Sequence, residues 1–330
     1  MLTILLLAAS ILDLGAVTEG EIYRVLKERH IPFDADAVHK SAVEAMIKAI
    51  DPRAKILSRE DAVKLLCGDT IEKAEEWPEG ICYLKLNGLY EGGGDKVTQR
   101  LKTWAEAGQS GVIVDIRDAG GNSLSAIDEI AGLFIPGNTV LYKIKDCRDR
   151  VIETYKTKEG LPSSAEAAGG DARPLNNMPL MLIIDDETCD ASEIMASVLK
   201  RQRGVMLIGA PTRGDSNLRE VILLSGDEVL YMSTRQIVLP DAASYSPDGV
   251  QPDIAVSKTA EEKKSGQPSQ DIPGEGRGHP LSDKEKLDRE LVSHVMGDAV
   301  LGRAVDILLG LKALAEPEHA AEKNEKAENK

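Results

Sequence analysis

Between Ile81 and Val256, short apolar runs alternate with longer segments whose apolar residues recur at helical spacing. Such runs, bounded by polar or glycine-containing turns, are typical of strands buried on both faces. The alternation therefore predicts an α/β domain built on a largely buried sheet. The expected strands are 82–86, 112–116, 140–144, 180–184 and 205–208, and the expected helices are 96–107, 124–134 and 191–201. Three more strands are expected at 221–224, 228–232 and 236–239, with a hairpin turn at 225–227 between the first two.

The rest of the chain divides into segments of distinct composition around this core. Apolar residues at helical spacing before Pro52 predict an N-terminal helical region, and a second apolar stripe begins at Leu287. A stretch rich in Ser, Gly, Pro and charge reads as a linker, and a second such stretch, 159–174, reads as a loop. The expected parts are a candidate signal segment 1–16, a helical region 17–78, the core 79–257, a linker 258–282, a helical segment 283–315 and a disordered tail or frayed helix 316–330.

The apolar run from Leu2 to Leu12 is too short to cross a bilayer. It resembles the apolar part of a signal peptide, although no Lys or Arg precedes it, and a buried N-terminal helix is the alternative. The first interpretation predicts a periplasmic or otherwise extracytoplasmic protein, and the second a cytoplasmic one. No other segment is long and apolar enough to suggest a transmembrane span.

Charge and cysteine spacing exclude some classes of partner. The net charge of −15 argues against binding the phosphate backbone of nucleic acid. Four cysteines, at positions 67, 82, 147 and 189, form no C-x-x-C pair, so the pattern is not that of a zinc knuckle. The sequence predicts no cofactor and identifies no metal ion.

Two motifs carry the chemistry that a function would need. The first reads Thr-Cys-Asp-Ala-Ser-Glu-Ile over 188–194, and the second reads Gly-Ala-Pro-Thr-Arg-Gly-Asp over 209–215. Both resemble the catalytic motifs of the tail-specific, or C-terminal processing, serine peptidases. Segments 42–52, 80–86, 114–122 and 245–254 resemble further motifs of that family, in family order. The resemblance implies a crotonase/Clp-protease-like peptidase core with an N-terminal helical region and a C-terminal helical appendage.

The resemblance also implies that both catalytic positions are substituted. The serine nucleophile of the family falls on Asp190, and its lysine base falls on Asp215. A third polar position, often acidic in the family, falls on Arg201, and the glycine pair beside the oxyanion hole falls on Gly120 and Gly121. No catalytic residue is therefore expected. The family often carries a PDZ domain where this chain has only about two dozen residues, 57–80, so a PDZ-less chain is expected.

Other residues could in principle replace the lost nucleophile. All five histidines lie outside the α/β core, which excludes a Ser-His-Asp triad within it. Ser192 lies about 200° around a helix from position 190 and should face elsewhere. Cys189 is adjacent, but the carboxylates around it should suppress its thiolate, so a structural role is favoured.

An acidic cluster surrounds the substituted positions, with Asp185 preceding it. Two carboxylates in contact must share a proton, bind a cation or pair with a base, and Arg213 and Arg201 are the candidate bases. We expect the fold to bring Asp190 and Asp215 close together. The members of the cluster are Asp186, Glu187, Asp190, Glu193 and Asp215.

Three functions remain open from the sequence. The first is a non-catalytic homologue, or pseudoenzyme, that binds peptide or protein C-termini or acts as a scaffold. The second is an active hydrolase that uses an altered site. The third is a small-ligand binder on the same fold, although the two Phe and two Trp residues argue against an aromatic-lined retinoid pocket.

Overall fold

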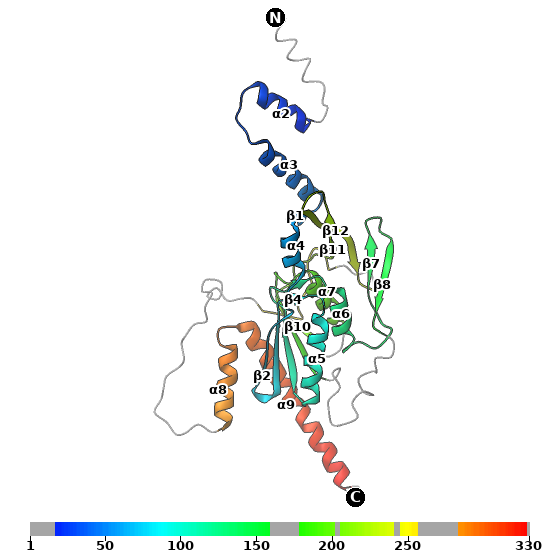
Figure 1. Cartoon of the computed structure of the whole chain (residues 1–330). Coiled ribbons are helices and arrows are strands. Elements are labelled where there is room, and N and C mark those ends of the chain that lie inside the picture. Colours follow the sequence, from blue (N-terminus) through cyan, green and yellow to red (C-terminus); the bar gives the residue numbers. More distant parts are fainter. Residues whose placement is uncertain (1–16, 159–177, 202–204, 241–244, 257–282, 329–330) are drawn as a thin grey trace, which may run out of the picture. The chain divides into compact units, whose positions relative to one another are not determined.

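The computed structural model describes residues 17–158, 178–201, 205–240, 245–256 and 283–328 (Figure 1). The candidate signal segment 1–16, the expected loop 159–174 and the linker 258–282 lie outside the described residues. The chain forms two compact units, with the boundary between Ile56 and Leu57.

The first unit holds two helices, as expected for the N-terminal region. Helix α2 is Glu19–Glu28, and helix α3 is Ala35–Ile50. Asp34 caps α3 by accepting hydrogen bonds from the backbone N–H groups of residues 36 and 37, at 3.0 and 3.1 Å. The hydroxyl of Tyr23 donates to the carbonyl of Ala35 over 3.1 Å and thereby ties the two helices together.

The second unit begins earlier than the sequence analysis placed the core. Strand β1 (Lys55–Ser58) crosses the unit boundary, and helix α4 (Arg59–Leu66), strand β2 (Ile71–Trp77) and a short 3₁₀ helix (Pro78–Gly80) follow. Strand β2 is rich in charge and shows no apolar run, but it pairs antiparallel with β3 along its whole length. Tertiary pairing here overrides local composition, so segment 57–80 belongs to the core rather than to a helical region.

A six-stranded sheet forms the centre of the second unit, in the order β13-β10-β9-β5-β3-β2 (Figure 1). All neighbours in this order are parallel except β2 and β3. Every residue of β5 and β9 is buried, as expected for apolar strands covered on both faces. The strands after β2 are β3 (Ile81–Leu86), β5 (Gly111–Asp115), β9 (Leu180–Ile184), β10 (Val205–Gly209) and β13 (Ile254–Ala255). The predicted α/β class is confirmed.

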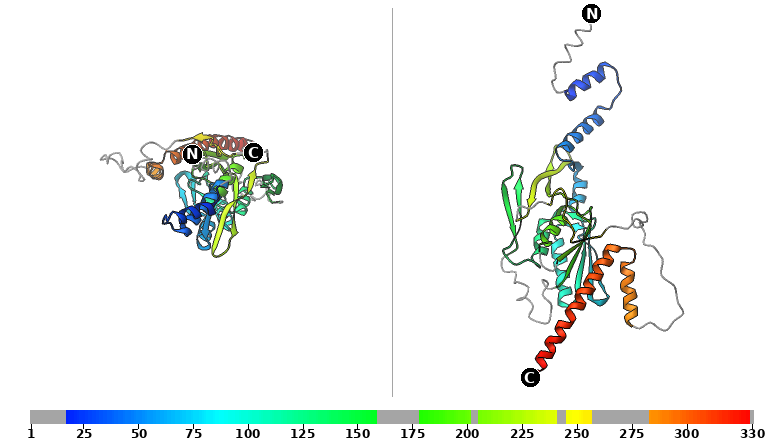
Figure 2. Two further views of the ribbon diagram at one scale, coloured as in Figure 1. Left: turned by 90° about the horizontal axis from the view of Figure 1, so that it is seen from above. Right: turned by 180° about the vertical axis from the view of Figure 1, so that it is seen from behind.

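Helices cover both faces of this sheet (Figure 2). One face packs against α5, α6 and α7, and its core includes the fully buried Trp104. The other face packs against α8 and α9, with Leu308 of α9 among its buried residues. The helices are α5 (Gly93–Glu106), α6 (Leu124–Ala131), α7 (Asp190–Leu199), α8 (Asp283–Val295) and α9 (Ala299–Glu328). Helix α9 thus continues through most of the segment expected as a disordered tail or frayed helix. Of the helices that the structure describes, none is long and apolar enough to cross a membrane.

A buried ion network fixes the start of α9 to the sheet. Arg117 donates to both oxygens of the buried Asp115, and also to Asp298 over 2.7 Å. Asp298 in turn caps α9 by accepting from the backbone N–H of Leu301 over 2.9 Å. Burial alone would raise the pKa of Asp115, but hydrogen bonds and charge from Arg117 and Lys85 outweigh it and lower that pKa.

The chain also forms an antiparallel sheet that is separate from the six-stranded sheet. The expected hairpin at 225–227 is confirmed, because β11 and β12 pair antiparallel around it. Strand β12 runs unbroken through 233–235, where the polar Ser-Thr-Arg sequence had suggested two strands. The strands of this sheet include β7 (Val140–Asp146), β8 (Val151–Lys156), β11 (Asn217–Leu223) and β12 (Glu228–Val238). Two short strands, β4 (Gly88–Leu89) and β6 (Gly120–Gly121), pair separately.

Candidate functional site

The candidate site lies at the loop that joins strand β9 to helix α7. The buried carboxylate of Asp185 accepts hydrogen bonds from the backbone N–H groups of Asp118, Glu187 and Thr188, at 3.1–3.2 Å. The hydroxyl of Thr188 donates to the carbonyl of Ile116 over 2.8 Å. These bonds join the loops after β5 and β9, so α7 begins at the carboxyl edge of the parallel sheet, where α/β folds usually place their sites.

Asp190 is the first residue of α7 and has a left-handed backbone, with φ of +50°. Few residues other than glycine adopt this conformation, although Asp and Asn tolerate it better than most. The backbone thus turns sharply at the position that the sequence analysis aligned with a nucleophile. The side chain of Asp190 is 32% exposed.

Arg219 connects Asp190 to Asp215. Its Nη1 donates to Asp190 Oδ1 over 3.1 Å, and its Nη2 contacts Asp215 Oδ2. The guanidinium is only 4% exposed and Asp215 is 9% exposed, so this is a largely buried ion triad. The expected proximity of the two aspartates is confirmed: both bind one arginine.

The bridging arginine is one that the sequence analysis did not name. Strand β11 starts at Asn217, four residues before the predicted start, and a β-bulge separates Leu218 from Arg219. A bulge re-aims the following side chain, and here the side chain reaches back to α7. Nothing in the local sequence marks this residue, because a lone arginine in a polar stretch usually faces solvent.

The two arginines that the sequence analysis proposed lie elsewhere. Arg213 forms an ion pair with Glu187 at the partly exposed edge of the site. Arg201 follows the far end of α7 and lines a separate hollow with Val198 and Pro240. Position 201 lies eleven residues past Asp190, and α7 spans Asp190–Leu199 of this stretch. At about 1.5 Å per helical residue the two positions are roughly 16 Å apart, so Arg201 cannot reach Asp190.

Glu193 organises the second motif. Its buried carboxylate accepts hydrogen bonds from the hydroxyl of Thr212 and from the backbone N–H groups of Gly214 and Asp215, the last two at 2.6 and 3.1 Å. Burial raises the pKa of Glu193, and these hydrogen bonds only partly oppose it. Glu193 therefore shapes the loop that presents Asp215, which is a structural role.

The expected acidic cluster divides into separate contacts. Asp190 and Asp215 share Arg219, Glu187 pairs with Arg213, Glu193 holds the second motif, and Asp186 is exposed. Among the described residues, no group of three His, Cys, Asp or Glu side chains is arranged to hold a metal ion.

The expected glycine pair, Gly120 and Gly121, lies beside Cys189 and Asp190. Gly121 has φ of +100°, and a Cβ there would come within 2.3 Å of the Leu89 backbone. A Cβ on Gly120 would lie 3.2 Å from Cys189 Sγ and 3.7 Å from Asp190 Oδ2. Glycine at 121 is thus required by the pairing of β4 with β6, and glycine at 120 lets its backbone pack closely against Cys189 and Asp190.

Two tyrosines face the triad from elements that the sequence analysis gave no role in the site. Burial, and then the charge of Asp190, raise the pKa of Tyr231 to about 12. Burial raises the pKa of Tyr245 well above its usual value, with Glu193 next in effect, and its hydroxyl has no hydrogen-bond partner among the described residues. Tyr245 was noted in the sequence only as part of a family motif.

The model of peptidase family S41 matches residues 80–256, slightly more than half of the chain.

The chain belongs to peptidase family S41.

Its curated relatives in this family include processing proteases of bacteria and chloroplasts. The carboxyl-terminal-processing protease of Synechocystis sp. is 24% identical over 180 residues, which are 54% of this chain and 39% of that protein. The chloroplastic carboxyl-terminal-processing peptidase 1 of Arabidopsis thaliana is 26% identical over 185 residues, which are 56% of this chain and 35% of that protein. The matched part therefore spans less than half the length of these relatives.

Solved structures of the S41 fold agree with the architecture. A protein of Parabacteroides merdae described as a peptidase superposes with a TM-score of 0.53 at 15% identity, covering 90% of this chain and 91% of that one. A protein of Bacteroides fragilis described as an S41 protease gives 0.52 at 16% identity, covering 74% and 59%. At these identities the likeness establishes the fold alone.

Two side chains near Asp190, Ser192 and Cys189, carry nucleophilic atoms. The hydroxyl of Ser192 is buried and donates to the carbonyl of Gly120 over 2.7 Å. Burial, and then the charge of Asp190, raise the pKa of the Cys189 thiol to about 12. At neutral pH that thiol stays protonated, and its Sγ lies 3.4 Å from Asp190 Oδ2 as a hydrogen-bond donor.

Proposed function

We propose that this S41 chain is a non-catalytic member of its family that binds extended peptide or protein tails, or serves as a scaffold for a complex that does. The observation that carries the proposal is the buried bridge from Arg219 to Asp190 and Asp215.

The chemistry of the bridge opposes peptide hydrolysis by the route that the family resemblance implies. A serine hydroxyl becomes a nucleophile when a neighbouring base takes its proton. Asp190 offers a carboxylate in place of the hydroxyl, and Asp215 offers an anion in place of a neutral amine. The guanidinium of Arg219 stays protonated in proteins and cannot act as the missing base.

The altered-site alternative lacks a specific observation in its favour. A cysteine mechanism would need the thiolate of Cys189, and the pKa of about 12 keeps it protonated. An aspartate pair acting by acid–base catalysis would need to share a proton, but Arg219 lies between the two carboxylates and compensates their charge.

Features that would serve binding are retained in this chain. The glycine pair that the family resemblance assigns to the oxyanion hole is present as Gly120 and Gly121, and Gly120 lies beside Asp190. The relatives named above are carboxyl-terminal-processing enzymes, which makes protein C-termini the first class of ligand to test.

The test is a binding titration in which the peptide is recovered afterwards. A short, unstructured, fluorescently labelled peptide is titrated with the purified chain, and the mixture is then examined by mass spectrometry. The proposal expects saturable binding with the peptide intact. Absence of binding at any attainable protein concentration would reject tail binding, and a shortened peptide would reject the non-catalytic assignment.

The proposal includes an extracytoplasmic location. It rests on the apolar run Leu2–Leu12 and on the bacterial and chloroplastic relatives. N-terminal sequencing of the native protein tests it, because cleavage near Val17 supports export and an intact Met1 in the folded, functional protein argues for a cytoplasmic chain.

A further inference from the structure

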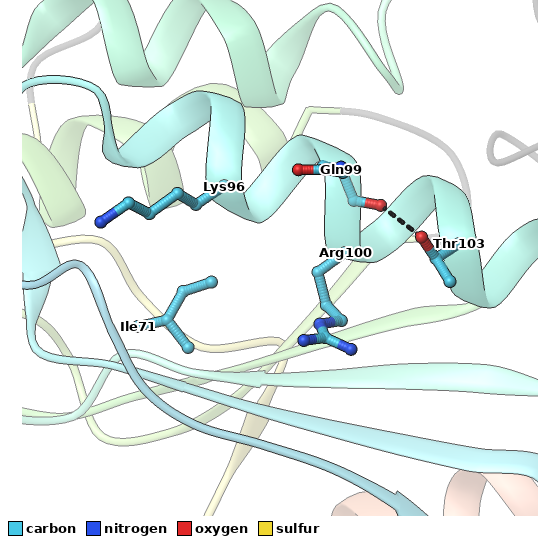
Figure 3. Close-up of a pocket in the computed structure, with 5 residues that line it drawn as sticks. All are labelled: Ile71, Lys96, Gln99, Arg100 and Thr103. Atoms are coloured by element: carbon cyan, nitrogen blue, oxygen red, sulfur yellow. Dashed lines mark hydrogen bonds between the residues drawn. The ribbon is translucent and has the colours of Figure 1, made fainter.

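A surface hollow of about 430 Å³ lies between helix α5 and the first residues of strand β2 (Figure 3). Its volume falls within the range of about 300–1,000 Å³ that is usual for ligand sites. No side chain that lines it belongs to the Asp190–Arg219–Asp215 triad. The lining residues are Ile71, Lys96, Gln99, Arg100 and Thr103.

One face of α5 brings positive charge to this hollow. Positions 96, 99, 100 and 103 follow the i, i+3, i+4, i+7 spacing that places side chains on one side of a helix. Arg100 has no carboxylate within ion-pair distance among the described residues, and its guanidinium carbon lies 5.9 Å from the Trp104 ring centroid. Lys96 has a weak partner, Asp69 at 3.8 Å, and both side chains are largely exposed. Two available cations on a chain of net charge −15 favour an anionic ligand.

The other wall of the hollow is the edge of the central sheet. Strand β2 is the last strand in the order and, within the described part of the chain, pairs with β3 alone. Its Ile71 and Ala74 pair with Leu86 and Leu84, so their partly buried side chains lie on the same sheet face as α5. A free strand edge offers backbone N–H and C=O groups, and extended peptides commonly bind by adding a strand to such an edge.

Two of the three glutamates of β2 have partners of their own. Glu76 lies near the C-terminal end of β2, on the sheet face that packs against α5. It accepts hydrogen bonds from Trp104 Nε1 over 3.0 Å and from Gln109 Nε2 over 3.3 Å. Glu75, on the opposite face, is held by Lys73 at 2.9 Å. These two glutamates lie toward Trp77. The third, Glu72, is exposed beside Ile71 and, among the described residues, forms no ion pair with Lys96 or Arg100, so both cations remain available to a ligand.

From this arrangement we infer that the hollow binds the free α-carboxylate of an extended peptide, with Lys96 and Arg100 contacting the carboxylate and β2 pairing with the preceding residues. The inference rests on the tail-binding function proposed above and assigns the tail to a place distinct from the substituted catalytic positions. An α-carboxylate fits better than an internal acidic side chain, because only a chain terminus can end between α5 and β2 while the backbone before it pairs with the strand.

The experiment compares one labelled peptide made with a free C-terminal carboxylate and as its C-terminal amide. Both are titrated against the wild-type chain, the double variant Lys96→Gln/Arg100→Gln and the control Lys102→Gln. Position 102 is two residues past Arg100, which is about 200° around α5. The control substitution therefore removes a charge from another face of the same helix. Glutamine keeps much of the apolar stem, and unchanged thermal melts show that each variant is folded.

The inference predicts that wild type binds the acid at least about tenfold more tightly than the amide, and that the double variant loses this preference. The control keeps it. Equal affinity for the two peptides, or a preference that survives in the double variant, would overturn the carboxylate site while leaving tail binding intact. Failure of wild type to bind either peptide would reject the proposed function itself. Inorganic phosphate that displaces the acid peptide at comparable concentration would assign the hollow to small anions and overturn the inference.

Discussion

Arg219 donates a hydrogen bond over 3.1 Å to Asp190, the first residue of α7. The same guanidinium contacts Asp215, in the loop that precedes β11. Two carboxylates that would otherwise place like charges together are thus compensated by one arginine of strand β11. A buried ion triad of this kind is costly to break by removing one member, because the remaining charges lose their compensation.

Replacement of Arg219 should therefore destabilise the fold strongly. We expect Arg219→Met to lower the free energy of unfolding by about 3 kcal/mol, and the triple variant that also carries Asp190→Asn and Asp215→Asn to regain most of this loss. Chemical denaturation of the single and triple variants measures both effects.

Arg213→Met is the matched control for this series. Its partner Glu187 is 58% exposed, so the expected loss is below about 1 kcal/mol. Equal costs for the two arginine substitutions, or a triple variant no better than Arg219→Met, would mean that the triad does not hold the site together.

The stability of the chain should also depend on the protonation of Asp128. Burial raises its pKa to about 6, and the hydrogen bond from Tyr142 over 3.1 Å only partly opposes this. In the unfolded chain the carboxyl titrates at about 3.9. Between these values the folded state holds a proton that the unfolded state has released, so stability falls as pH rises through this window.

Asp128→Asn should remove that loss, since an amide oxygen can still accept from Tyr142. We expect the variant to gain about 1 kcal/mol at neutral pH, after allowance for partial solvent exposure, and to match wild type below both pKa values. Thermal melts across the acid range, with Asp186→Asn as an exposed control, test this. A variant that is less stable than wild type at neutral pH would contradict it.

The four cysteines should divide into two reactive and two protected thiols. Cys67 and Cys147 are exposed, whereas Cys82 and Cys189 are buried and burial raises the pKa of each to about 12. Iodoacetamide should therefore label only the exposed pair in the folded protein and all four after unfolding. Peptide mapping distinguishes the sites. Labelling of Cys189 as fast as Cys67 would revive a cysteine-based altered site.

The core was predictable because its strands and helices each carry a strong local pattern. Strand β9 coincides with the predicted 180–184, and α7 begins one residue before its predicted start. Strand β2 was missed because its residues are mostly charged and only pairing with β3 makes them a strand.

The site itself was only partly predictable. The motifs aligned Asp190 and Asp215 and led to the expectation that they lie close together, which the fold confirms. The partner Arg219 was not predictable, because its approach depends on a bulge in β11 and on the long reach of its side chain to α7. Such long-range contacts leave no periodic signal in a single sequence.

The account is tested most directly by prolonged incubation of the pure chain with an unstructured protein, with products identified by mass spectrometry and Asp190→Ala as the reference. Loss of a catalytic serine in another serine protease lowers turnover by about 10⁶-fold, so we predict no products beyond those formed with the Asp190→Ala variant. Cleavage by wild type that disappears in Asp190→Ala, while that variant stays folded, would contradict the account.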